Sequence, residues 1–249
     1  MAGEIADNRG RGGTPWSLPS IHPEGRRLGL AVGGVGLAAL LFGWHWLGWP
    51  TLLIALALFA IFRDPERVIP QDDHAILAPV DGTVTQIVSD IPPEELRIDD
   101  GSGNSGLDDT SRTRISIYCS LLDAHINRIP ISGTVRRIVY MPGEFGSAEL
   151  DRASEVNERQ YYLIERSDAL QVGMTQVAGT LARRIVSFVK DGDSVGAGQR
   201  IGMIPFGSRI DVWLPTGTEA AVLLGQRCVA GETIIAKVGE RPAIEGVRQ

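Results

Sequence analysis

An uncharged apolar stretch near the N-terminus limits what this chain can fold into. Residues 28–62 contain no Asp, Glu, Lys or Arg, while Arg26 and Arg27 precede the stretch and Arg63 and Arg67 follow it. The stretch is too long for a cleavable signal peptide, which has one short apolar core. Because positively charged flanks stay on the cytoplasmic side, the pattern predicts a segment held in the cell membrane from its cytoplasmic face.

The stretch is interrupted near its middle, which argues against a single membrane-spanning helix. Pro50 and the Trp-rich run 43–49 divide it into two arms, 28–43 and 51–62. As helices, the arms would be about 24 Å and about 18 Å long, short of the roughly 30 Å hydrocarbon core of a bilayer. We therefore predict a membrane-anchoring hairpin over 28–62, peripheral or monotopic. The alternative is a buried core hairpin of a soluble protein.

The sequence on either side of the hairpin has a different character. Residues 1–27 are rich in Gly, Arg, Asn, Ser and Pro, which predicts a disordered leader. Over 63–249, short β-rich runs alternate with turn residues, so we expect a mainly β domain with a few helices (α+β), one half of it barrel-sandwich-like. We expect a solvated loop over 90–112 and a helix over 147–157. Strands are predicted at 75–77, 82–88, 113–119, 133–140, 160–165, 170–177, 185–189, 200–204, 208–214 and 233–238.

Composition excludes several classes of function. The net charge of −6 argues against a nucleic-acid binder that neutralises phosphates, because such proteins carry a basic excess. The two cysteines, Cys119 and Cys228, cannot form a disulfide framework or, by themselves, a four-ligand zinc site. Since the chain also has only four histidines, we predict no metal centre.

Three short clusters carry side chains that are suited to catalysis. Asp81 lies in a Pro-Val-Asp-Gly turn, His125 lies in the run Asp-Ala-His-Ile-Asn-Arg-Ile-Pro, and Ser208 follows Gly207 at the start of a predicted strand. Each pattern alone is common, because Asp-Gly is typical of hairpin turns and most Gly-Ser pairs are turn residues. Their occurrence together in one chain is more specific.

Together, the clusters resemble the phosphatidylserine decarboxylase proenzymes in their short bacterial form. The resemblance covers 62–215 and, less specifically, the apolar stretch before it. Five or six ordered motifs in one chain rarely arise by chance. The motifs are Phe62-Arg63-Asp64-Pro65-Glu66-Arg67, Pro79-Val80-Asp81-Gly82, His125 to Pro130, Ala153-Ser154-Glu155 with Asn157-Glu158-Arg159, Val177-Ala178-Gly179, and Gly207-Ser208.

The resemblance implies an enzyme that makes its own prosthetic group, a pyruvoyl group derived from Ser208. In this family, the serine hydroxyl attacks the carbonyl of the preceding residue, here Gly207, and the chain is cut between the two. The products would be the chains 1–207 and 208–249, which stay together as a heterodimer. A lysine-bound cofactor fits less well, because neither of the two lysines lies in a Gly-rich phosphate loop.

The resemblance alone does not assign the general base. Many family members have two histidines in the order His-Arg-x-His-x-Pro, and the second drives self-cleavage within an Asp-His-Ser triad. Aligned on Pro130, His125 matches the first, substrate-handling histidine, and Arg128 stands in place of the second. Since arginine stays protonated, either His125 serves both steps or Asp81 acts without a histidine relay. We favour Asp81 for self-cleavage and expect His125, Asn127 and Arg128 to contact substrate, Arg128 through a phosphate or carboxylate.

The activity that the resemblance implies is conversion of phosphatidylserine to phosphatidylethanolamine, with release of carbon dioxide at the membrane surface. Two alternatives remain at this point. One is a pyruvoyl-dependent decarboxylase of a related serine phospholipid or a soluble amino acid, and the other is a non-enzymatic, membrane-anchored β module. The apolar hairpin favours a lipid substrate, and the sequence leaves a homo-oligomer open.

Overall fold

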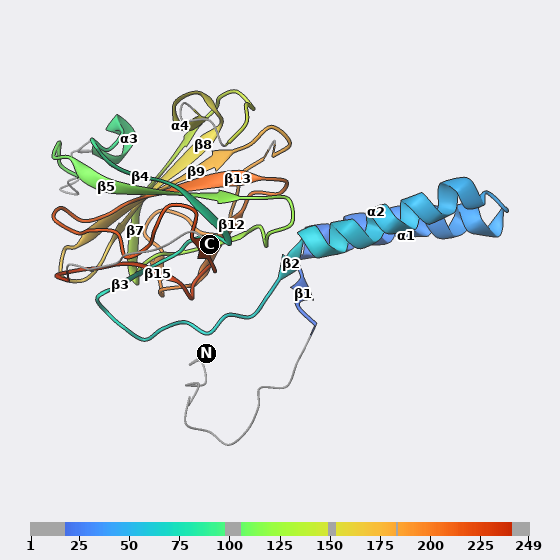
Figure 1. Cartoon of the computed structure of the whole chain (residues 1–249), viewed down its shortest axis with the longest axis horizontal. Helices are drawn as coiled ribbons and strands as arrows, with labels where there is room; N and C mark the ends of the chain where they lie inside the picture. The colour runs from blue at the N-terminus through green and yellow to red at the C-terminus, as the bar shows by residue number, and fades with distance from the viewer. Residues whose placement is uncertain (1–17, 98–105, 149–152, 183, 241–249) are drawn as a thin grey trace, which may run out of the picture.

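The computed structural model describes residues 18–97, 106–148, 153–182 and 184–240. A helical hairpin projects from a β-rich domain (Figure 1). Ordered structure begins before residue 28, because strand β1 (Ser20–Ile21) and the start of the first helix lie within the predicted leader; 1–17 lie outside the described residues. Strand β1 pairs with β2 (Arg63–Asp64), so the two ends of the hairpin are tied together at its base.

The hairpin consists of α1 (Pro23–Leu41) and α2 (His45–Ile61). Both helices are longer than the predicted arms, because α1 begins at Pro23 and α2 continues through Pro50. A proline this close to the helix start removes one hydrogen bond without ending the helix. Small residues let the two helices approach closely, since a Cβ added at Gly29 of α1 would lie 2.4 Å from the Phe59 ring of α2.

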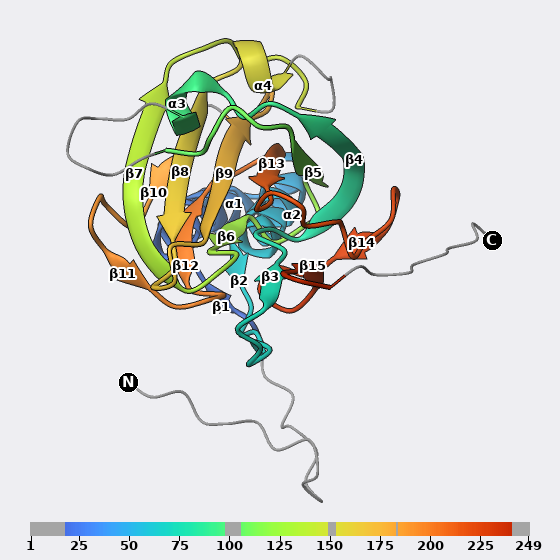
Figure 2. The ribbon, with the colours of Figure 1, turned by 90° about the vertical axis from the view of Figure 1, so that its left-hand side faces the viewer.

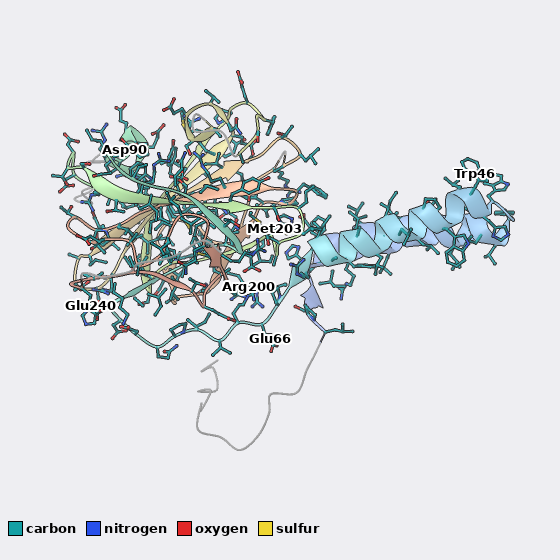
Figure 3. All side chains as sticks on the ribbon, in the orientation of Figure 1. Trp46, Glu66, Asp90, Arg200, Met203 and Glu240 are labelled. Carbon is teal, nitrogen blue, oxygen red and sulfur yellow. The ribbon has the colours of Figure 1, made fainter. Side chains whose placement is uncertain are left out.

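Large apolar side chains are exposed along the whole hairpin. Trp46, at its far end in Figure 3, is 79% exposed, and Leu53 is 66% exposed. The other exposed large apolar side chains here are Leu28, Leu30, Val35, Leu37, Leu41, Phe42, Trp44, Trp49, Ile54 and Leu56. Among the described residues, no helix is both long enough and apolar enough to cross a membrane.

An eight-stranded antiparallel sheet forms the body of the β domain and curls round on itself (Figure 2). The strand order is β11-β7-β8-β9-β13-β5-β4-β14. These strands are β4 (Gly82–Asp90), β5 (Arg112–Cys119), β7 (Gly133–Met141), β8 (Arg159–Glu165), β9 (Gln171–Ala178), β11 (Ser194–Val195), β13 (Ser208–Trp213) and β14 (Arg227–Cys228).

Smaller elements complete the domain. Strand β12 (Arg200–Met203) pairs with β10 (Val186–Ser187) on one side and with β6 (Ile126–Arg128) on the other. Strands β3 (Ala75–Leu77) and β15 (Ile234–Lys237) form a separate pair, and α3 (Glu94–Arg97) and α4 (Ala153–Val156) are single turns of helix. The prediction of a mainly β fold with a few helices and a barrel-like half is confirmed.

The central strand β13 separates two environments. Alternate residues of a strand point to opposite faces of its sheet. Ile210 and Val212 of β13 therefore join the main apolar core, while Trp213 belongs to a second cluster on the other face.

The described part of the predicted loop 90–112 is less solvated than its composition suggests. Leu96 and Leu107 are each only 1% exposed and pack in the cluster of Trp213. Burial of these two leucines is sufficient to dock the segment on the apolar face of the sheet, although most of its other residues are polar.

Candidate active site

Ser208 begins the central strand β13 and lies in the protein interior. Its partners across the two strand pairs are Cys119 of β5 and Ala178 of β9, so the three side chains form a row on one face of the sheet. The Ser208 hydroxyl is buried and makes no hydrogen bond of full geometry among the described residues. The Cys119 thiol lies beside it, and the interaction with the hydroxyl acts to lower the pKa of that thiol. Buried polar groups usually have stronger partners than a thiol, so this hydroxyl is poorly satisfied.

The backbone immediately before Ser208 adopts an uncommon conformation. Phe206 has a φ of +69° and Gly207 a φ of +84°, so two consecutive residues are left-handed. Glycine adopts this conformation readily, whereas a bulky residue such as phenylalanine rarely does. Backbone strain of this kind concentrates at functional sites.

The Gly207 carbonyl packs directly against Gly179. A Cβ added at Gly179 would lie 2.6 Å from the Gly207 oxygen, closer than a real Cβ can approach. The glycine of the Val-Ala-Gly motif therefore provides the space for the carbonyl that precedes Ser208.

His125 reaches the row of Ser208 through the thiol of Cys119. His125 Nδ1 lies 3.4 Å from Cys119 Sγ, and Nε2 is buried and makes no hydrogen bond of full geometry in the described part of the chain. An interaction of the ring with the Leu121 backbone acts to raise the pKa of His125, against the larger effect of burial. Burial lowers the pKa of His125 to about 4, so the ring is neutral at pH 7. Burial also raises the pKa of the Cys119 thiol, and the charges of Asp123 and Asp81 act in the same direction. The site therefore combines a neutral imidazole with a protonated thiol.

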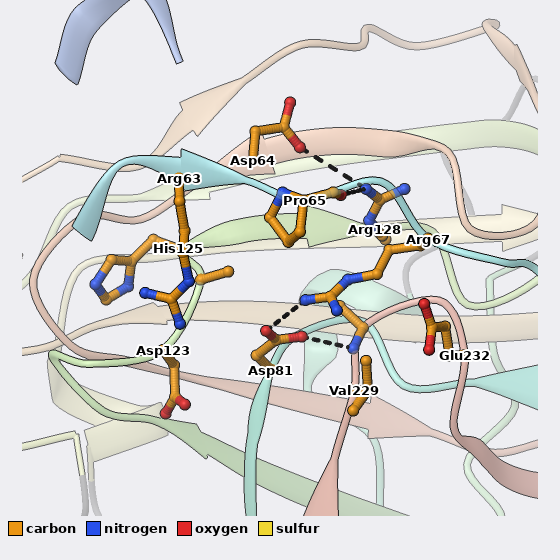
Figure 4. Close-up of polar contacts among 12 residues, drawn as sticks. Arg63, Asp64, Pro65, Arg67, Asp81, Asp123, His125, Arg128, Val229 and Glu232 are labelled. Carbon is orange, nitrogen blue, oxygen red and sulfur yellow. Dashed lines mark hydrogen bonds and ion pairs between the residues drawn. The ribbon is translucent and has the colours of Figure 1, made fainter. Parts of the chain in front are cut away.

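Asp81 is held at the edge of this site by two donors. Arg67 Nη2 lies 2.5 Å from Asp81 Oδ2, and the backbone N–H of Ala230 donates to Oδ1 at 2.8 Å (Figure 4). Through space, the negative charge of Asp81 acts to raise the pKa of His125. Within the described residues, no hydrogen bond joins Asp81 to His125 or to Ser208. The structure thus gathers the three predicted residues in one region without linking them as a contiguous triad.

Arg63 lies beside His125, at the junction with the hairpin (Figure 4). Its guanidinium donates to the carbonyl oxygens of Ala60 at 2.8 Å and Leu122 at 2.7 Å. Its positive charge acts to lower the pKa of His125, which adds to the effect of burial. Arg63 therefore joins the end of α2 to the loop that carries His125.

Arg128 and Asn127 lie next to each other on β6 but differ in their free hydrogen-bonding capacity. Arg128 donates to the carbonyl oxygens of Gly198 at 2.8 Å and Pro65 at 3.0 Å. Asn127 Oδ1 accepts a hydrogen bond from Gln176 Nε2 at 2.6 Å, while Asn127 Nδ2 is buried without a partner in the described part of the chain. Arg128 also forms an ion pair with Asp64 at 3.8 Å (Figure 4). Asn127 therefore retains a donor that a substrate can use, whereas Arg128 would have to exchange three protein partners.

Comparison with known proteins decides the family. The family model of phosphatidylserine decarboxylase matches residues 55–236. The chain belongs to this family. The phosphatidylserine decarboxylase proenzyme of Novosphingobium aromaticivorans is 56% identical to it over 249 residues, which cover 100% of this chain and 99% of that protein. Proteins of the same name are 54% identical in Erythrobacter litoralis (100% of both chains) and 47% identical in Zymomonas mobilis subsp. mobilis (91% and 90%).

The family membership confirms the resemblance inferred from the motifs. Phosphatidylserine decarboxylases are carboxy-lyases that act on phosphatidylserine. The prediction of an enzyme is therefore confirmed, and the alternative of a non-enzymatic β module is not supported. The individual site residues stay predictions, and the geometry described above is what supports them.

The decarboxylase motif at 153–159 braces β13, the strand of Ser208, and its neighbour β9. Asn157 Nδ2 donates to the carbonyl oxygen of Ala178 at 2.8 Å and so fixes the end of β9. On the other face of the sheet, the Ser154 hydroxyl donates to the Asp211 carboxylate in β13. The motif thus supports the site from its surroundings and supplies no group to the row of Ser208.

Sequence reasoning missed three contributors to the site: Cys119, Gly179 and Arg67. Cys119 carries no motif, and only the pairing of β5 with β13 places it beside Ser208. Gly179 and Arg67 lie in motifs that indicated the family, but nothing in the sequence shows that they contact the Gly207 carbonyl and the Asp81 carboxylate.

Proposed function

We propose that this chain is a pyruvoyl-dependent phosphatidylserine decarboxylase, made as a proenzyme that cuts itself between Gly207 and Ser208. The observation that carries the proposal is the buried Ser208 hydroxyl, which has only the Cys119 thiol beside it and directly follows two left-handed residues. A serine with a small, flexible residue before it is what an attack on the preceding carbonyl requires.

The proposed cleavage uses atoms of the chain and one water molecule. Ser208 Oγ attacks the Gly207 carbonyl carbon, the C–N bond between the residues breaks, and the freed amine takes up the proton. The ester then eliminates: a base removes the Ser208 Cα proton, the Cβ–O bond breaks, and Gly207 leaves as a carboxylate. The dehydroalanine at position 208 takes up water and loses ammonia, which leaves a pyruvoyl group at the start of 208–249.

The surroundings of Ser208 fit such a group. The six residues of β13 pair with β5 on one side and β9 on the other, so 208–249 stays bound to 1–207 after the cut. Cys119 and Ala178 flank the new N-terminus with short side chains, which leaves it in a buried, apolar environment. A pyruvoyl carbonyl supplies the sink for the electron pair that remains when carbon dioxide leaves.

The neighbouring residues take separate roles in this proposal. The neutral His125 ring can exchange a proton with the substrate through Nε2. Asn127 Nδ2 can donate a hydrogen bond to the substrate. Asp81 is fixed by Arg67 and supplies a negative charge during self-cleavage. Arg128 stays a predicted contact for a phosphate or carboxylate group, and it would first have to release Gly198, Pro65 and the Asp64 carboxylate.

Gly179→Ala is expected to slow self-cleavage about 10-fold or more, because the added Cβ displaces the Gly207 carbonyl from its position before Ser208. The appearance of the 42-residue fragment after synthesis measures the rate. Gly196→Ala is the matched control, since a Cβ there meets nothing within 4 Å. Equal rates in the two variants would contradict the role of this contact.

The hairpin supports a lipid substrate presented by a membrane over a soluble amino acid. Its exposed leucines and tryptophans extend along the whole hairpin, and exposed apolar surfaces of this kind mark sites of membrane or partner contact. Arg26, Arg27 and Arg63 lie at its base, where the headgroups of an anionic cytoplasmic leaflet would meet them. We therefore place the enzyme on the cytoplasmic side of the cell membrane, anchored by the hairpin.

Leu53→Glu tests both the anchor and the substrate class. A carboxylate near the middle of α2 is expected to weaken binding to phosphatidylserine vesicles about 100-fold, because charge inside a bilayer is costly. Decarboxylation of vesicle lipid should fall in parallel, while decarboxylation of detergent-dispersed lipid should not.

Leu224→Glu is the control, since this leucine on the β domain is 57% exposed, comparable to Leu53 at 66%. Unchanged vesicle binding by Leu53→Glu would exclude the hairpin anchor. Faster turnover of free serine than of phosphatidylserine by the unaltered enzyme would favour the soluble-substrate alternative.

A further inference from the structure

The base of the hairpin packs directly on the residue that precedes the proposed cleavage site. Phe62, which follows the last residue of α2, is 5% exposed, and its ring meets the Phe206 ring edge-on with the centroids 5.8 Å apart. Both rings belong to a small apolar cluster with Ile126 and Met203. Met203 lies where the hairpin joins the β domain in Figure 3. The anchor and the cleavage site are therefore in contact.

Phe206 has a backbone conformation that is unusual for a bulky residue. Among the described residues, Phe206 and Ala169 are the non-glycine residues with a positive φ. Such a backbone persists only where the surroundings hold it in place. Rotation of Phe206 to an ordinary φ would move its ring out of the cluster, so packing on Phe62 opposes that rotation.

Phe62 is itself held firmly. The backbone N–H of His22 donates to the Phe62 carbonyl oxygen at 2.9 Å, and the Phe62 N–H donates to Leu58 O at 3.0 Å. On the next residue, the Arg63 side chain binds the carbonyl oxygen of Leu122, in the loop before His125. The ring of Phe62 thus forms a fixed surface against which Phe206 rests.

We propose that Phe62 is a positioning residue for self-cleavage. By holding Phe206 in its left-handed conformation, it places the Gly207 carbonyl within reach of Ser208 Oγ. The inference rests on the proposed self-cleavage and adds a dependence to it: the chain matures efficiently only when the hairpin is seated on the β domain. Assembly of the anchor then precedes formation of the prosthetic group.

The test follows the rate at which newly synthesised full-length chain is cut. Phe62→Ala is expected to slow cleavage about 10-fold, because Phe206 then relaxes to an ordinary φ for most of the time. Phe62→Leu, which keeps an apolar contact, should retain most of the rate. Phe59→Ala is the matched control, since Phe59 lies three residues earlier, within α2, and packs on α1, where its ring approaches Gly29. Its rate should equal that of the unaltered chain.

A second substitution separates positioning from loss of stability. Glycine adopts a positive φ without a partner, so Phe206→Gly should make cleavage independent of Phe62. The double variant Phe62→Ala with Phe206→Gly should therefore be cut as fast as Phe206→Gly alone, although it has lost more packing than Phe62→Ala. A merely structural role of Phe62 predicts the opposite, a double variant that is cut more slowly than either single variant.

The outcomes distinguish this inference from the proposed function. If the unaltered chain is cut and Phe62→Ala is cut equally fast, or is slowed equally in the Phe206→Gly background, the positioning role is wrong while self-cleavage stands. If the unaltered chain is never cut between 207 and 208, both proposals fail.

Discussion

Ser208→Ala is expected to leave a single, uncut chain of 249 residues with no decarboxylase activity. The hydroxyl that attacks the Gly207 carbonyl is absent from this variant, and no pyruvoyl group can form from alanine. The fold should be preserved, because alanine fits the same space and the substitution removes only a weak interaction of the hydroxyl with the Cys119 thiol. A denaturing gel and an assay for carbon dioxide release give both results.

Ser208→Cys is the informative companion of this variant. A thiol can also attack the carbonyl and then eliminate, so slow cleavage and partial activity are expected. If Ser208→Ala still yields the 42-residue fragment, the assignment of the cleavage site is wrong.

His125→Ala and Asp81→Asn are expected to separate the two stages of the enzyme. General acid–base help is typically worth about 10²–10⁴-fold. If His125 handles substrate, the His125→Ala chain should still be cut. Its decarboxylation rate should fall by about 10²–10⁴-fold. Asp81→Asn should be the stronger block on cleavage, because it removes the carboxylate that Arg67 and the Ala230 N–H hold in the site.

The contact between His125 and Cys119 provides the competing arrangement. Through the thiol, the neutral His125 ring is connected to the row of Ser208, which would let it serve the cleavage step as well. Separate measurements of cleavage and of turnover by cut enzyme decide between the two. Normal cleavage in Asp81→Asn together with loss of cleavage in His125→Ala would reverse the roles.

The long strands were predictable because their pattern is local. The run 113–119 was predicted as a strand and corresponds to β5 (Arg112–Cys119), and 208–214 corresponds to β13 (Ser208–Trp213). Strand β6 (Ile126–Arg128) was missed because it is only three residues long and all three are buried, so no alternation of polar and apolar residues marks it. The helical start of α2 was missed because Pro50 reads as an interruption in sequence but lies within the helix.

The site was predictable as a set of residues but not as an arrangement. The motifs identified Asp81, His125 and Ser208, because the chemistry of the family needs those residue types. Their relation depends on the pairing of β5 with β13, which brings Cys119 beside Ser208 from a distant part of the sequence. The contact of Phe62 with Phe206 likewise joins two motifs whose proximity only the fold reveals.

The intact mass of the purified, unaltered protein is the sharpest test of self-cleavage and pyruvoyl formation. We expect two chains, 1–207 and 208–249, the second lighter than the corresponding serine-initiated peptide by one ammonia. Ser208→Ala, measured in parallel, should give only the full-length mass. A full-length chain that decarboxylates phosphatidylserine, or a 208–249 fragment with an ordinary serine at its N-terminus in the active enzyme, would contradict it.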